Sequence, residues 1–141
     1  MYKLRPIKFR GFNKKRGIWL YGNYILNRGA HFIAPQEFAD GKTWDDYEVE
    51  EESIGQFIGL YDRNGNEIYE GEILKCYDDK TDPLSCDYLC VVRYNTTIES
   101  ITPGFILCGE NIDFPITEFE AVEAIGAVFD NPELLEKGGE K

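Results

Sequence analysis

The stretch SIGQFIGLYDRNGNEIYEGEILK, residues 53–75, decides the fold of this chain. Two runs rich in aromatic and branched side chains, GQFIGLYDR and NEIYEGEILKCY, flank the pair Asn64-Gly65. Such a pair adopts the positive φ angles that a tight turn requires, and runs of this composition are typical of strands. We therefore predict a β-hairpin within residues 55–77 that turns at or beside Asn64-Gly65.

The same turn carries oxygen-bearing side chains at alternate positions, as a calcium-binding loop does: Asp62, Asn64 and Asn66. An EF-hand loop also needs Gly at its sixth position and a bidentate Glu at its twelfth. Those positions hold Glu67 and Ile73 in this chain. The pattern therefore predicts a turn and not a calcium site.

On the N-terminal side, a second hairpin is predicted. The runs IKFRGF (residues 7–12) and IWLYGNYIL (residues 18–26) flank a polar turn at residues 13–17. A third short strand, HFIAP, ends at Pro35. The acidic run at residues 47–53 is expected to be a solvated strand or loop.

On the C-terminal side, turn residues separate further β-type runs. We predict four strands, at residues 72–77, 88–95, 104–108 and 122–129. Gly126 allows a bulge or a close approach in the last of them. A short C-terminal helix follows, in which Asn131 can cap, Pro132 suits the first helical position and Gly138-Gly139 ends the helix.

These elements predict a mostly β fold. The C-terminal part, residues 53–141, is expected to form a small SH3-like antiparallel barrel that ends in the short helix. Residues 1–52 are expected to add an N-terminal layer of β-hairpin and strand. The two parts together are expected to make one compact unit.

The composition favours a folded cytoplasmic protein. The chain has 141 residues, 43% of them hydrophobic, and its short apolar runs exclude a membrane span. The basic N-terminus lacks the apolar stretch of a secretion signal. The four cysteines, at positions 76, 86, 90 and 108, contain no C-x-x-C pair. We therefore predict cysteines that pack in the core, with no disulfide, no structural metal and no cofactor.

The charge is strongly asymmetric along the chain. Residues 1–42 carry nine Lys/Arg and two Asp/Glu, whereas residues 43–141 carry six Lys/Arg and twenty-four Asp/Glu. The basic segment could contact nucleic acid, or acidic surface of its own or another subunit. It interleaves aromatic residues with seven candidate contact residues: Lys3, Arg5, Lys8, Arg10, Lys14, Lys15 and Arg16. We favour a structural interpretation, in which this segment is a hairpin with its basic side chains outside and its aromatic side chains in the core.

Three blocks of the sequence together resemble the YopX family, found mainly in phages and prophages. They are IKFRGFNKKRGIWLYGNYI (residues 7–25), SIGQFIGLYDRNGNEIYEGEILK (53–75) and EAIGAVFDNPELL (123–135), and they cover about two fifths of the chain. Residues 30–52 and 76–118 depart from the family pattern. The resemblance implies an SH3-type barrel in the C-terminal part and carries no established biochemical activity.

No catalytic motif stands out, so we expect that the protein is not an enzyme. Glu67, Glu70 and Glu72 are close in sequence, and Glu70 and Glu72 would share a strand face, as solvated strands often show. His31 is expected to be a packed or surface imidazole, although a Cys–His pair stays open. The favoured function is a non-enzymatic protein-interaction module with two kinds of partner, itself (as a homo-oligomer) and a host protein. The alternatives are nucleic-acid binding through the basic segment and an acidic DNA mimic that inhibits a host enzyme.

Overall fold

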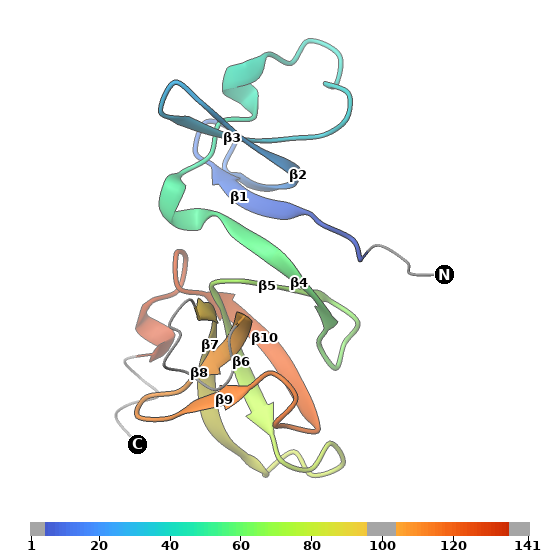
Figure 1. Cartoon of the computed structure of the whole chain (residues 1–141), viewed down its shortest axis with the longest axis vertical. Coiled ribbons are helices and arrows are strands. Elements are labelled where there is room, and N and C mark those ends of the chain that lie inside the picture. The colour runs from blue at the N-terminus through green and yellow to red at the C-terminus, as the bar shows by residue number, and fades with distance from the viewer. Residues whose placement is uncertain (1–4, 96–103, 136–141) are drawn as a thin grey trace. The chain divides into compact units, whose positions relative to one another are not determined.

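The computed structural model describes residues 5–95 and 104–135 and consists mainly of β-strands (Figure 1). The chain divides into two compact units, residues 1–59 and residues 60–141. Its strands form two antiparallel sheets of five strands each. The predicted mostly β fold is confirmed.

The first unit is built on the predicted N-terminal hairpin. Strands β1 (Phe9–Asn13) and β2 (Ile18–Asn27) pair antiparallel around the polar turn. Strand β3 (Ala30–Ala34) pairs with the second half of β2. Strand β4 (Gly55–Tyr61) pairs with the other edge of β1, which gives the order β3-β2-β1-β4. The three predicted N-terminal strands are therefore confirmed, each within two residues of its predicted start.

The acidic run after β3 is an extended segment hydrogen-bonded on both sides. The Val49 N–H donates to the His31 carbonyl of β3 over 2.9 Å, and the Glu50 N–H donates to the Phe12 carbonyl of β1 over 3.0 Å. Tyr47 and Val49 are buried, so the segment alternates between core and solvent. Two short 3-10 helices flank it, η1 (Trp44–Asp46) and η2 (Glu51–Ser53).

The predicted central hairpin is confirmed. Strand β5 (Glu67–Tyr69) follows β4 in the first sheet, and no helix interrupts the segment. The Asp62 N–H donates to the Asn66 carbonyl over 2.8 Å, and the Gly65 N–H donates to the Asp62 carbonyl over 2.9 Å. Gly65 has a φ angle of 82°, the left-handed conformation for which glycine is suited.

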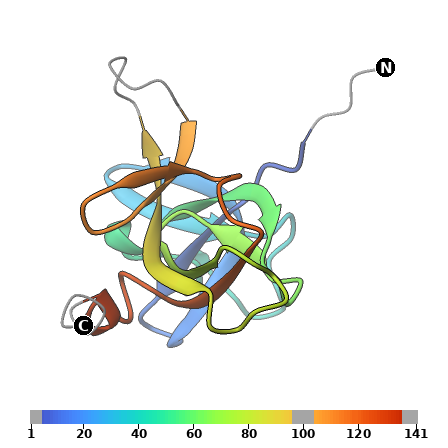
Figure 2. The same cartoon turned by 90° about the horizontal axis from the view of Figure 1, so that it is seen from below.

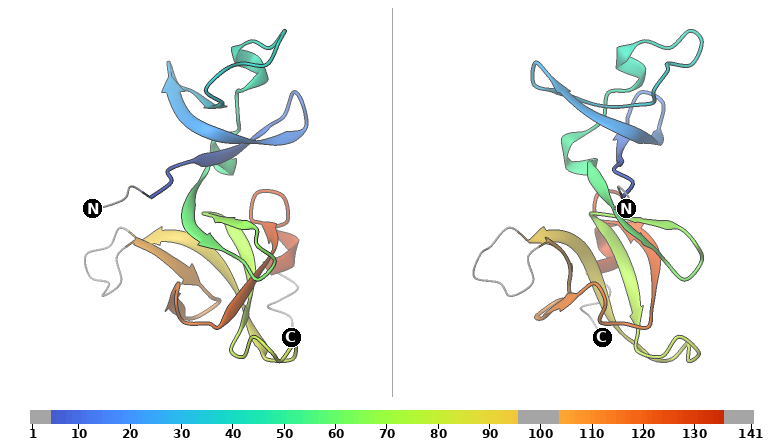
Figure 3. Two further views of the ribbon diagram at one scale, coloured as in Figure 1. Left: turned by 90° about the vertical axis from the view of Figure 1, so that its right-hand side faces the viewer. Right: turned by 45° about the vertical axis from the view of Figure 1, so that its right-hand side comes forward.

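The second unit holds a sheet of order β10-β6-β7-β8-β9. Its strands are β6 (Glu72–Tyr77), β7 (Cys86–Asn95), β8 (Gly104–Cys108), β9 (Asp113–Pro115) and β10 (Ala121–Ala127). Figures 2 and 3 show β7 curving strongly along its length. The pairing leaves β9 and β10 as two edges, so the described residues form no closed barrel. β9 was not predicted, because three residues are too few to show an alternating pattern.

One face of this sheet lies in the core of the second unit. Five side chains from three neighbouring strands are no more than 1% exposed: Leu74, Cys76, Cys90, Val92 and Leu107. Residues two apart on a strand share a face, so the alternation that the sequence shows places each of them on the same side. The predicted core packing is confirmed for Cys76 and Cys90.

The last strand contains the predicted irregularity at Gly126. The register of β10 against β6 shifts between Ala124 and Gly126, which marks a bulge. A Cβ atom on Gly126 would lie 2.6 Å from Asn131 Oδ1, so the chain also approaches closely there. A helical turn begins at Glu133, and its continuation to the predicted end at Gly138-Gly139 lies outside the described residues. None of the helical segments in the described ranges has the length and hydrophobicity of a membrane span.

Candidate functional site

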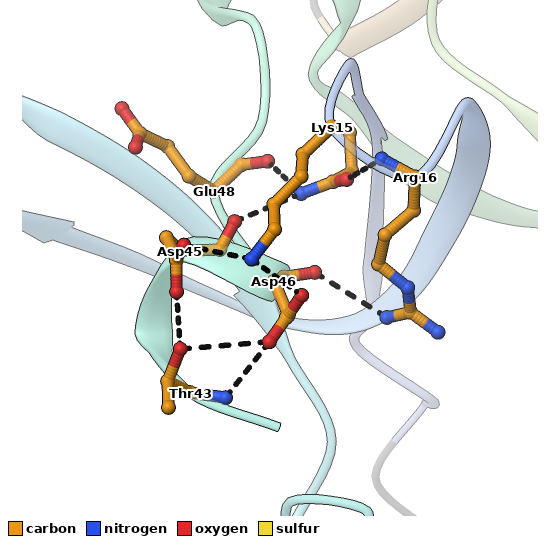
Figure 4. Close-up of polar contacts among 7 residues, drawn as sticks. Lys15, Arg16, Thr43, Asp45, Asp46 and Glu48 are labelled. Atoms are coloured by element: carbon orange, nitrogen blue, oxygen red, sulfur yellow. Dashed lines mark hydrogen bonds and ion pairs between the residues drawn. The ribbon is translucent and has the colours of Figure 1, made fainter. Parts of the chain in front are cut away.

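The turn between β1 and β2, which holds three of the seven candidate contact residues, is organised by Asn13 (Figure 4). Asn13 is 1% exposed. Its amide nitrogen donates to the Glu48 carbonyl over 2.7 Å and to the Asp45 carbonyl over 3.3 Å, and its oxygen accepts from the Arg16 N–H over 2.7 Å. Asn13 therefore ties the basic turn to the acidic segment that follows β3.

Lys15 bridges two carboxylates of that acidic segment. Its Nζ lies 2.8 Å from Asp45 Oδ2 and 2.9 Å from Asp46 Oδ1. Hydrogen bonds from Lys15 and then from the Thr43 hydroxyl lower the pKa of Asp45 to about 2. The Thr43 N–H, followed by Lys15, lowers the pKa of Asp46, and both carboxylates raise the pKa of Lys15. All three groups are therefore charged at neutral pH.

The neighbouring cations also have partners inside the first unit. Lys14 Nζ lies 3.0 Å from Glu50 Oε1. The Arg16 guanidinium donates to the Asp46 carbonyl over 3.3 Å and lies 5.8 Å from the centroid of the Tyr47 ring. The structure thus brings Lys14, Lys15 and Arg16 together at one turn and pairs each with acidic or aromatic groups.

The remaining candidate residues lie along and before β1. Arg10 is 8% exposed and stacks at 4.1 Å over the Trp19 ring, and Lys8 lies 5.2 Å from the centroid of the Phe57 ring. Arg5 is exposed, and Lys3 lies outside the described residues. Five of the seven candidates therefore lie either at the turn, where each has a partner, or on and just before β1, where cations cover aromatic rings.

The two units differ sharply in charge. The first carries nine Lys/Arg and eight Asp/Glu, whereas the second carries six Lys/Arg and eighteen Asp/Glu. The asymmetry along the chain is thus nearly neutralised within the first unit, because its acidic residues include the run that packs against the basic turn. The acidic excess therefore belongs to the second unit.

The loop between β6 and β7 presents an apolar side chain on acidic surroundings. Leu84 is 89% exposed. The loop is ordered by its own polar groups: Asp79 Oδ1 accepts from the Thr81 N–H and Asp82 Oδ1 from the Leu84 N–H, each over 2.9 Å, and the Ser85 hydroxyl donates to the Asp82 carbonyl over 2.8 Å. The Thr81 bonds lower the pKa of Asp79. The sequence signal for this feature is a single apolar residue in a polar loop.

Two of the three neighbouring glutamates, Glu67 and Glu72, hydrogen-bond to Tyr69, and the prediction that Glu70 and Glu72 share a strand face is wrong. Glu70 lies in the turn between β5 and β6. Glu72 is 8% exposed, and its Oε1 accepts from the Tyr69 N–H over 2.7 Å. Glu67 Oε1 accepts from the Tyr69 hydroxyl over 2.8 Å. Both carboxylates therefore anchor Tyr69.

His31 packs against an aromatic ring, as predicted. Its ring is stacked on that of Tyr24 with centroids 5.8 Å apart, and its Nδ1 lies 2.7 Å from the Tyr24 hydroxyl. Its Nε2 lies 3.7 Å from a carboxylate oxygen of Glu51. The stacking and the hydrogen bond to Tyr24 fix the orientation of the imidazole.

The four cysteines divide into two environments. Cys76 and Cys90 lie in the core, whereas Cys86 and Cys108 are half-buried. A hydrogen bond with Cys90, and then burial, raises the pKa of Cys76. Burial, together with the nearby Asp113, raises the pKa of Cys108. Within the described ranges, no three His, Cys, Asp or Glu side chains gather closely enough to hold a metal ion.

We predict four free thiols and no bound zinc. In the folded protein, a thiol reagent such as Ellman's reagent is expected to modify the half-buried Cys86 first and the half-buried Cys108 more slowly, because the raised pKa of Cys108 leaves less thiolate. It is expected to reach Cys76 and Cys90 only after unfolding. A count below four in denaturant, or stoichiometric zinc by metal analysis, would contradict the prediction.

The comparisons with known proteins bear on this arrangement. The sequence profile of the family described as YopX protein matches residues 8–136. The chain belongs to the YopX protein family. The family resemblance that the sequence shows is therefore confirmed, and it extends over both units and over the middle segment that the three sequence blocks leave out.

Among solved structures, this YopX-family chain is similar to the crystal structure of protein EF1440 from Enterococcus faecalis. The similarity has a TM-score of 0.55 and 23% sequence identity, and it covers 92% of this chain and 98% of that one. At this identity it shows the fold alone. No curated protein matches the YopX-family chain significantly.

Proposed function

We propose that this YopX-family protein is a non-enzymatic protein-interaction module whose second unit binds a basic surface of a host protein. The observation that carries the proposal is Leu84, held 89% exposed on an ordered acidic loop. Aliphatic side chains presented by a preorganised loop lose little conformational entropy on binding. The excess of carboxylates around it selects a cationic partner and speeds encounter.

The fold of the second unit supports this function. We infer that it is a variant of the SH3-type barrel, because the last strand of its five-stranded sheet, β10, lies beside the first strand of that sheet, β6, and the others follow in chain order. This order, with strong strand curvature, is typical of SH3-type sheets. Edge strands and surface grooves of such sheets accept protein segments, which is an argument from the fold.

The experiment is a pull-down from lysate of the host at low and at high salt, with two matched variants. We expect one basic protein to be retained by the native chain, lost with Leu84→Ser and retained with Leu26→Ser. Leu26 is 59% exposed in the first unit and serves as the control for removal of an exposed leucine. A chain that retains no protein, or a Leu84→Ser variant that binds as the native chain does, would contradict the proposal.

The same pull-down separates the two alternatives. Recovery of nucleic acid would favour binding through the basic segment, against which the ion pairs of Lys14 and Lys15 within the first unit argue. The acidic second unit favours the DNA-mimic alternative more. In that case the retained protein would be a DNA-binding enzyme, and added duplex DNA would release it.

We also propose that the protein is a homo-oligomer. Light scattering at physiological salt is expected to give a multiple of the chain mass of 16.2 kDa. If the basic segment joins subunits through charge, about 1 M salt should dissociate the oligomer, because screening shortens the range of such pairs to about 3 Å. An oligomer that persists is held by apolar contacts, and a monomer at physiological salt would refute self-association.

A further inference from the structure

The outer face of the second unit's sheet contains a pocket with an uneven distribution of charge. Its volume is about 530 Å³, within the range of about 300–1,000 Å³ that ligand pockets occupy. It is lined by Leu89 and Val91 of β7, by Cys108 of β8 and by Leu135 in the C-terminal helical turn. These four residues form the apolar part of the lining.

The charged residues of the pocket lie at its two ends. Arg93 and Asp87 both line it and lie on β7 six positions apart, which corresponds to about 20 Å of extended chain. Cys108 of β8 pairs with Val91 of β7, and the two strands are antiparallel. Glu110 follows Cys108 by two residues and also lines the pocket, so it lies toward the Asp87 end. Lys75 lies opposite Leu89 on β6. Lys75 therefore flanks the middle of the pocket, Arg93 lies at one end, and Asp87 lies at the other with Glu110 on its side.

From this arrangement we propose that the pocket binds an extended protein segment of about four to six residues with an apolar centre and opposite charges at its ends. The acidic residue of the segment pairs with Arg93, and its basic residue faces Asp87 and Glu110. The apolar side chains between them cover Leu89 and Val91. The inference deepens the proposed function, since it names a binding surface distinct from Leu84 and the kind of segment that fits it.

The test is selection from a displayed hexapeptide library on the full-length protein. We expect enrichment of segments with one acidic end, one basic end and apolar residues between them. With Arg93→Glu both ends of the pocket are acidic, so the same selection should yield segments with two basic ends. The affinity of the original segments, measured by fluorescence polarisation, should fall about fivefold, as for exposed ion pairs.

Arg28→Glu is the matched control, because it makes the same substitution at an exposed position of the first unit, outside the pocket. It should select the same segments as the native chain. No enrichment, enrichment without paired opposite charges, or an unchanged selection with Arg93→Glu would overturn the inference. If the peptide selection overturns the pocket inference while the pull-down still depends on Leu84, the proposed interaction function stands without the pocket.

Discussion

The Asp62→Asn variant is expected to lose about 2 kcal/mol of the free energy of unfolding of the second unit. Asp62 is 5% exposed at the base of the central hairpin. One oxygen accepts from the N–H groups of Asn64 and Asn66, each over 2.9 Å, and the other accepts from the Ala124 N–H over 3.1 Å. The carboxylate thus joins the hairpin to β10. In the Asp62→Asn variant an amide nitrogen replaces one of the two oxygens, so that a hydrogen-bond donor faces a backbone N–H group, which is also a donor.

The effect should depend on pH. Burial raises the pKa of Asp62, but hydrogen bonds from the N–H groups of Asn66, Ala124 and Asn64 outweigh it, so the pKa lies below its usual value. The carboxylate therefore stabilises the fold fully above its unfolded pKa, about 3.9, and loses this contribution as the pH falls through the lower folded pKa. The difference between Asp62→Asn and the native chain should consequently shrink in acid below about pH 4.

Amide hydrogen exchange at Asn64, Asn66 and Ala124 reports this change locally, and urea unfolding by circular dichroism reports it globally. Asp40→Asn makes the same chemical change on an exposed side chain of the first unit and should alter neither. Equal stability of the Asp62→Asn and native chains at pH 7 would show that the hairpin is held by its backbone alone.

The Asn13→Ala variant is expected to lose about 3 kcal/mol in the first unit. Truncation leaves the carbonyls of Asp45 and Glu48 and the Arg16 N–H without their partner in a site where Asn13 is 1% exposed. Unsatisfied buried polar groups cost more than the bonds themselves contribute, because water cannot replace the missing partner. Asn13→Asp should cost still more, since it places a carboxylate against two carbonyl oxygens.

Tryptophan fluorescence gives a readout specific to this unit, because both tryptophans, Trp19 and Trp44, belong to it. The urea midpoint followed by fluorescence should fall for both Asn13 variants. Asn23→Ala, at an exposed position on β2, is the control and should leave the midpoint unchanged. If Asn13→Ala unfolds at the native midpoint, the ion pairs of Lys14 and Lys15 suffice to hold the acidic segment.

Much of the strand pattern could be read from the chain itself. The Asn64-Gly65 turn, the β1–β2 hairpin and the bulge at Gly126 depend on φ preferences and on alternation over a few residues, and these are local properties. The family followed from the same residues, since its blocks coincide with these turns and strands. Errors arose where a local pattern was short or ambiguous, as with β9 and with the turn at Glu70.

The candidate sites depended on tertiary structure. The sequence showed a basic segment and an acidic run, but only the fold put Asp45 and Asp46 against Lys15, thirty residues earlier. It likewise placed Arg93, Asp87 and Glu110 around one pocket and left Leu84 in solvent. Backbone preferences of a residue and its near neighbours determine where strands and turns form. Which distant side chains meet is decided by strand pairing and burial across the whole unit, and no local pattern records that choice.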